Sequence, residues 1–145
     1  MYKHILVPVD GSKLSQKAVR SAASLAKTVK ARVTLFYVAP DSGGIYYMES
    51  PLLTSRYTAA SFKATVDKHA QKLLEQAAKG AGMEVQTRHV ISEFPYDAIV
   101  RQAAKLKCDL IVMASHGHRG IKGLLLGSET QKVLTHTKLP VLVVH

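Results

Sequence analysis

The chain has 145 residues and a mass of 15.8 kDa, with 47% hydrophobic and 21% charged residues. This length suits one domain, which we place at residues 1–145, and the composition excludes disordered, collagen-like and coiled-coil proteins. The single cysteine, Cys108, excludes an intramolecular disulfide and is expected to be a small buried hydrophobic residue.

The charge is strongly basic, with 20 Lys and Arg against 10 Asp and Glu and a formal net charge of +10. The cations occur singly, as at Lys13, Lys17, Arg20 and Lys27, and no aromatic residues alternate with them. This spacing favours solvated helix faces over a nucleic-acid surface, so we expect no nucleic-acid partner. The chain shows neither a secretory signal pattern nor a run long enough to span a membrane, so we expect a cytoplasmic protein with no membrane partner.

The first half of the chain alternates apolar runs with helical periodicity. A strand is predicted at residues 5–9, and it ends at Asp10-Gly11-Ser12, a turn and helix-start cluster. The helix that follows is marked by apolar residues at steps of three and four: Leu14, Ala18, Ala22, Leu25 and Val29. A second strand is predicted at residues 32–38. The stretch 39–58 is longer than an ordinary connection, and its Tyr46, Tyr47 and Met48 fit a ligand cover, a partner contact or a mobile loop equally well.

The second half continues the alternation. A helix is predicted at residues 59–78 and is ended by Gly80 and Gly82. A strand at 84–91, a helix that starts at Pro95 and a strand at 110–114 follow. After a glycine-rich loop at 117–127, the run from Ser128 to Gln131 matches a capping box, which makes Ser128 the predicted N-cap of a short helix. The last strand is predicted at residues 139–144.

Strands that alternate with helices predict an α/β fold, a doubly wound parallel sheet with helices on both faces. In such a sheet a ligand binds beyond the carboxyl ends of the strands, where the strand order reverses. The loops richest in glycine and helix caps follow the first strand and the strand at 110–114. We therefore expect these two strands to be neighbours and their loops to form the site.

The loop after residue 114 has the features of a phosphate-binding site. Gly117 lets the backbone approach a ligand closely, Gly127-Ser128 opens a helix whose free N–H groups favour an anion, and Arg119 and Lys122 could add charge as further phosphate contacts. A tight turn with a well-capped helix explains the same residues equally well. Neither a Walker motif nor Gly-x-Gly-x-x-Gly is present, so neither a P-loop enzyme nor a dinucleotide dehydrogenase is indicated.

Other polar residues near these loops could also take part in a site, with different strength of support. Asp10 places a carboxylate in the expected cleft, although it could serve only as a turn and helix cap. A divalent ion that bridges to phosphates would make that carboxylate favourable. His116 and His118 have no clear third metal ligand, and Ser115 lacks the leading glycine of a nucleophile elbow, so a resident metal site and hydrolase chemistry are both disfavoured.

Three segments together resemble the universal stress protein family. They are the opening His4-Ile5-Leu6-Val7-Pro8-Val9-Asp10-Gly11-Ser12, the Gly-x2-Gly-x9-Gly-Ser/Thr-like stretch from Ala114 to Ser128, and the closing Leu139-Pro140-Val141-Leu142-Val143-Val144. The resemblance covers the whole chain. It departs at Ala114, which stands where the family motif has its first glycine; this alanine is harmless at a negative φ and obstructive at a positive one.

The resemblance implies a five-stranded parallel sheet in the order 3-2-1-4-5, a homodimer formed through the last strand (Val141–Val144), and a family with ATP-binding and non-binding branches. We expect the ATP-binding branch, with ATP, ADP or AMP as the ligand and Mg²⁺ bound through its phosphates near Asp10. It places Asp10 at the ribose and phosphates, Pro8 and Val9 beside it, and the main chain of Val38 at adenine. The ribose and phosphate wall is implied to consist of Met113, Ala114, Gly117, Gly127, Ser128, Glu129 and Thr130.

The implied function is that of an ATP-binding stress-response or signalling protein that acts through nucleotide occupancy and its dimer surface. We expect at most slow ATPase activity, because no residue is placed as a base or an arginine finger. The alternative is a nucleotide-free module in which Ala114 closes the pocket and the basic surface recruits an unidentified protein partner.

Overall fold

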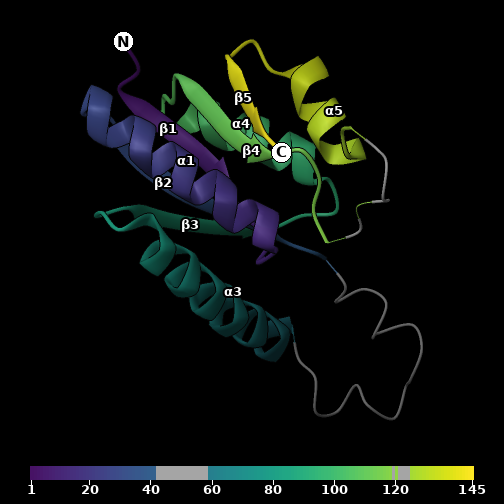
Figure 1. Cartoon of the computed structure of the whole chain (residues 1–145). Helices are drawn as coiled ribbons and strands as arrows, with labels where there is room; N and C mark the ends of the chain where they lie inside the picture. Colours follow the sequence, from purple (N-terminus) through teal and green to yellow (C-terminus); the bar gives the residue numbers. More distant parts are fainter. Residues whose placement is uncertain (42–58, 119, 121–124) are drawn as a thin grey trace.

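The computed structural model describes residues 1–41, 59–118, 120 and 125–145. Its centre is a five-stranded parallel sheet in the order β3-β2-β1-β4-β5 (Figure 1). The strands are β1 (His4–Pro8), β2 (Arg32–Ala39), β3 (Gln86–Ile91), β4 (Leu110–Ala114) and β5 (Val141–Val144). The strand order and the parallel pairing confirm the predicted fold, and β1 and β4 are neighbours as expected.

Within the described ranges, two helices cover each face of the sheet. Helices α1 (Lys13–Val29) and α3 (Ala59–Ala81) lie on one face, and α4 (Pro95–Lys105) and α5 (Ser128–His136) on the other (Figure 1). Successive side chains of a strand point to opposite faces. In β1, Ile5 and Val7 therefore pack under α1 and α3, whereas Leu6 joins the cluster that includes Ile99 of α4 and Val133 of α5.

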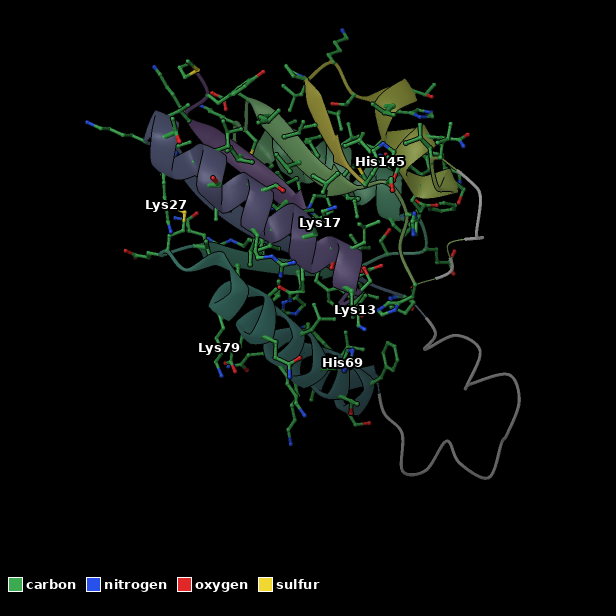
Figure 2. The ribbon with its side chains drawn as sticks, viewed as in Figure 1. Lys13, Lys17, Lys27, His69, Lys79 and His145 are labelled. Carbon is green, nitrogen blue, oxygen red and sulfur yellow. The ribbon has the colours of Figure 1, made fainter. Side chains whose placement is uncertain are left out.

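Helix α1 forms as its sequence pattern predicts. Ser12 is the N-cap, and its side chain accepts a hydrogen bond from Ser15 N at 3.1 Å. Lys30 ends the helix in the left-handed region at φ 58°. The lysines of α1 and α3 extend into solvent, as Lys27 and Lys79 do in Figure 2, which confirms the expected solvated faces.

Cys108 is buried and 6% exposed, which confirms its predicted place in the core. Burial, followed by the charge of Asp109, raises the pKa of its thiol to about 11. The thiol is thus protonated and shielded in the folded protein. Among the described residues, no helix is both long and apolar enough to cross a membrane.

Several predicted boundaries are wrong. Helix α3 continues through Gly80 to Ala81, and only Gly82, at φ 60°, lies beyond its end. Strands β3 and β5 each begin two residues later than predicted, at Gln86 and Val141. Of the predicted long connection, residues 42–58 lie outside the described residues, and so do Tyr46, Tyr47 and Met48.

The predicted capping box is also wrong. Gly127 is the N-cap of α5, Ser128 is the first helical residue, and no side chain caps the helix. The Gln131 side chain donates from Nε2 to Leu126 O at 3.1 Å instead of reaching back to an N-cap amide. Long-range contacts hold this helix start, as the site geometry shows, and they override the local capping pattern.

Candidate functional site

The carboxyl ends of β1 and β4 bring two connections together: the Asp10 loop (residues 9–12) and the start of the β4–α5 connection (residues 115–118). Asp10 joins them. Its Oδ1 accepts a hydrogen bond from Ser12 N at 2.9 Å, and its Oδ2 accepts one from His118 N at 3.2 Å. His118 Nε2 lies 2.9 Å from Asp10 O, so the ring donates to that carbonyl. Asp10 is therefore both the turn residue of the alternative interpretation and a carboxylate at the expected edge of the sheet.

Glycine is required at two positions of this junction. At Gly117 a Cβ would overlap Asp10 Oδ2, so any side chain would separate the two loops. Gly11 has a φ of 84°, in the region that L side chains rarely adopt. Both glycines let the backbone of the two loops meet closely at the carboxylate.

Asp10 stays charged although it is half-buried. Burial raises the pKa of the Asp10 carboxyl group. Three effects together outweigh burial and bring the pKa below its usual value of 3.8: the hydrogen bonds of Ser12, the charge of His118 and the hydrogen bonding of Ser15. A phosphate beside this anion would be repelled unless a cation lay between them. Among the described residues there is no cluster of three or more His, Cys, Asp or Glu side chains that could hold a metal ion by itself.

Ala114 has a backbone conformation that tolerates its methyl group. It is the last residue of β4, and the only non-glycine residues with positive φ in the described part of the chain are Lys30 and Lys107. Because alanine is harmless at a negative φ, its methyl group does not strain the backbone here. The missing first glycine of the motif is therefore no backbone obstacle.

The start of α5 is fastened to the end of β4. Thr130 Oγ1 donates to Ala114 O at 2.9 Å, and Gly127 N donates to Ser115 O at 2.6 Å. A Cβ at Gly127 would lie 3.1 Å from His116 Cα and 3.3 Å from Ser115 O, so the approach is close. The amides of Ser128 and Glu129, in the first turn, have no acceptor within the helix and are held beside the Asp10 junction.

Three of the implied site residues belong to the core through their side chains. Val9 and Met113 are each 5% exposed, Val9 under α1 and α3 and Met113 in the cluster with Ile99 and Val133. Val38 is partly buried against that second cluster, and Pro8 is partly exposed. Any ligand contact of Val9, Val38 or Met113 depends on main-chain atoms, because the side chains pack inward.

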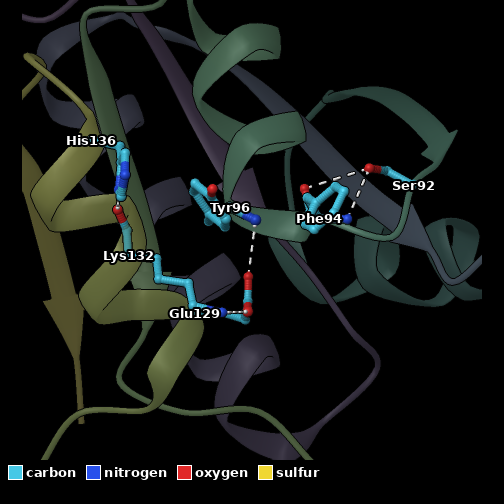
Figure 3. A network of polar contacts seen from close by, with 6 residues as sticks. All are labelled: Ser92, Phe94, Tyr96, Glu129, Lys132 and His136. Atoms are coloured by element: carbon cyan, nitrogen blue, oxygen red, sulfur yellow. Dashed lines mark hydrogen bonds and ion pairs between the residues drawn. The ribbon is translucent and has the colours of Figure 1, made fainter.

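Glu129 makes contacts that its sequence position did not reveal. Its Oε2 accepts a hydrogen bond from Tyr96 N at 2.9 Å, and its Oε1 lies 3.1 Å from Lys132 Nζ (Figure 3). Tyr96 is in the first turn of α4, where Phe94 as N-cap provides no side-chain hydrogen bond. Glu129 thus caps α4 from α5, and its carboxylate points toward that helix.

The remaining candidates divide between described and undescribed positions. His116 is half-buried, and its Nδ1 lies 3.1 Å from Ser115 Oγ, whereas His118 is exposed and bound to Asp10. The Ser115 hydroxyl is buried in a residue that is 1% exposed, which does not suit a nucleophile. Arg119 and Lys122 lie outside the described residues.

With this geometry in place, comparison with known proteins decides the family. The family model described as the universal stress protein family matches residues 1–145. The chain belongs to this family. The sequence resemblance is thereby confirmed, and it extends over the whole chain.

Individual members of the family agree with this assignment. Universal stress protein MJ0531 of Methanocaldococcus jannaschii is 33% identical over 99% of this chain and 82% of its own length. The solved structure of protein MJ0577 from the same organism is 30% identical, with a TM-score of 0.79 over 99% of this chain and 96% of that one. A universal stress protein crystallised in complex with cAMP is 27% identical, with a TM-score of 0.72 over 99% and 97% of the two chains.

Proposed function

We propose that this universal stress protein binds an adenine nucleotide at the carboxyl ends of β1 and β4 and acts in a stress response through occupancy of that site. The observation that carries the proposal is the junction of Asp10, Gly117 and the start of α5. It combines closely approaching backbone, free helix amides and an ionised carboxylate at the switch point of a doubly wound sheet. The structural neighbour that binds cAMP supports an adenine nucleotide as the ligand class.

The residues take different parts in this proposal. The free amides of Ser128 and Glu129 and the Ser128 hydroxyl hold phosphate beside the Gly127 backbone, and the main chain of Val38 and Met113 meets the base and ribose. Asp10 faces the ribose, or a Mg²⁺ ion that bridges it to the phosphates, because the bare carboxylate would repel them. Bound nucleotide orders both loops and so changes the surface that a partner protein meets.

The first experiment asks whether nucleotide is present and bound. Freshly purified protein is denatured and any released nucleotide is identified by chromatography, and the emptied protein is titrated with Mg-ATP by calorimetry. We expect released adenine nucleotide or micromolar binding of Mg-ATP. Absence of both, up to millimolar Mg-ATP, would refute the proposal and favour the nucleotide-free interaction module.

Two variants place the binding at the proposed site. Gly127→Val inserts a side chain where even a Cβ has close contacts, so binding should be lost. Ser128→Ala removes only a hydroxyl that caps nothing in the structure, so it should weaken binding while the fold stays intact. The matched control is Ser24→Ala, an exposed serine of α1, which should bind as the wild type does. Equal binding by Ser128→Ala, Gly127→Val and the control would place the nucleotide elsewhere.

A further inference from the structure

A basic cleft lies on the α1 side of the β4–α5 connection. It has a volume of about 390 Å³ and is lined by cationic side chains of α1 (Lys13, Lys17 and Arg20) together with Ser115, His116 and His145. Figure 2 shows Lys13 and Lys17 along α1 and His145 at the end of β5. No Asp or Glu side chain is among the described residues that line it.

The position of these cations is unfavourable for the helix itself. Lys13 is the first residue of α1, where the helix dipole disfavours positive charge, and the first turn holds no acidic residue. Lys13 and Lys17 are four residues apart on one face, and like charges at this spacing repel. Within the described part of the chain, neither Lys13 nor Arg20 has an ion-pair partner. An anion in the cleft would remove this repulsion.

One contact shows that the cleft presents donors to oxygen. Lys17 Nζ donates to the main-chain oxygen of His145, which lines the same cleft. The Lys17 ammonium, although exposed, is therefore directed at an oxygen of a residue that lines the cleft. A phosphate oxygen is a strong, charge-assisted acceptor for an ammonium group.

The cleft shares a wall with the proposed phosphate site. Ser115 and His116 line it, and the same two residues touch Gly127: Ser115 O accepts from Gly127 N, and the Cβ position of Gly127 lies 3.1 Å from His116 Cα. A phosphate bound at the start of α5 would therefore be separated from the basic cleft only by Ser115 and His116, which touch both. A chain of two or three phosphates has the reach to extend from one into the other.

We propose that the basic cleft is a subsite for the distal phosphates of a nucleotide whose first phosphate lies at the start of α5. This inference rests on the proposed function and adds to it the selectivity of the site. Lys13, Lys17 and Arg20 contact the β- and γ-phosphates, and a nucleoside monophosphate does not reach them. The protein therefore binds nucleoside triphosphates in preference to monophosphates.

The test compares AMP, ADP and ATP by calorimetry at fixed ionic strength, on the wild type and on a double variant, Lys13→Gln with Lys17→Gln. The double variant should bind ATP about tenfold or more weakly and AMP within about twofold of the wild type, since each lost contact is a charge-assisted one. The matched control is Lys27→Gln with Lys79→Gln, which removes the same charge from exposed positions. It should leave the affinities for ATP and AMP unchanged.

The outcomes separate this inference from the function on which it rests. If the wild type binds nucleotides and the Lys13 and Lys17 variant keeps the wild-type ratio of ATP to AMP affinity, the subsite is refuted and the proposed function stands. An equal loss of ATP affinity in the control variant would assign the effect to overall charge and would also refute the subsite. If no adenine nucleotide binds the wild type, the proposed function fails and the subsite fails with it.

Discussion

Thr130→Val tests the contact that fixes the start of α5 to the sheet. Valine keeps the shape of threonine and removes only the hydroxyl. That hydroxyl is in a residue 3% exposed and donates to Ala114 O at 2.9 Å. Loss of a buried hydrogen bond that leaves its acceptor without this donor costs about 1–3 kcal/mol. For a chain of this length, each kcal/mol corresponds to a fall in Tm of roughly 2–4 °C.

Thr135→Val is a control in the same helix. The Thr135 hydroxyl also donates to a main-chain oxygen, Gln131 O at 2.8 Å, but Thr135 is exposed and water can replace the donor. Its change in the free energy of unfolding should stay within about 0.5 kcal/mol. Urea denaturation at neutral pH, with the slope m compared among all three proteins, measures both values.

The two variants should also differ in nucleotide binding. Thr130→Val loosens the helix start that presents the amides of Ser128 and Glu129, so Mg-ATP binding should weaken, whereas Thr135→Val should bind as the wild type does. A loss of stability below about 0.5 kcal/mol for Thr130→Val, or equal losses for both variants, would show that the contact to Ala114 does not hold α5 in place.

Two further predictions concern acid stability and assembly. Burial, then the charge of Arg32, lowers the pKa of His4 below 6.5, and its neutral ring lies 3.1 Å from Leu106 O through Nδ1 and 2.8 Å from Thr34 Oγ1 through Nε2. The unfolded state therefore binds a proton more readily, so stability is complete above about pH 6.5 and falls as the pH falls toward the folded-state pKa of His4. Urea unfolding at about pH 7.5 and pH 5 measures this loss of stability. The wild type and the exposed-site control His136→Gln should show it in full, and His4→Gln should show less of it. An undiminished loss in His4→Gln would contradict the assignment of the acid instability to His4. Strand β5 is the last strand of the sheet and Leu142 is 43% exposed, so we predict a homodimer through Val141–Val144 that Leu142→Glu converts to a monomer. Sedimentation of the wild type as a monomer at micromolar concentration would rule this assembly out.

The local features of the fold follow from the sequence because they depend on neighbouring residues. The apolar steps from Leu14 to Val29 predict the buried face of α1, and the apolar run 110–114 predicts β4 to the residue. The meeting of Asp10 with the loop after β4 also follows, since the alternation of strands and helices limits the sheet to few topologies. Family resemblance then supplied the strand order, which the structure confirms.

Features that depend on distant parts of the chain were decided only by the tertiary structure. The local pattern makes Ser128 a good N-cap, but Ser115 O holds Gly127 N and Ala114 O holds Thr130, so the helix starts one residue away from the pattern. Glu129 caps Tyr96, which lies 33 residues earlier, and no spacing rule reaches that far.

The sequence by itself determined the order of the elements, the core faces and the residues that could form a site. Packing decided which backbone groups remain free at that site, the negative φ that makes Ala114 acceptable, and the meeting of three α1 cations with His116 in one cleft. The physical reason is range: periodicity and capping act within a turn or two of chain, whereas hydrogen bonds and charges act between any groups that folding brings together.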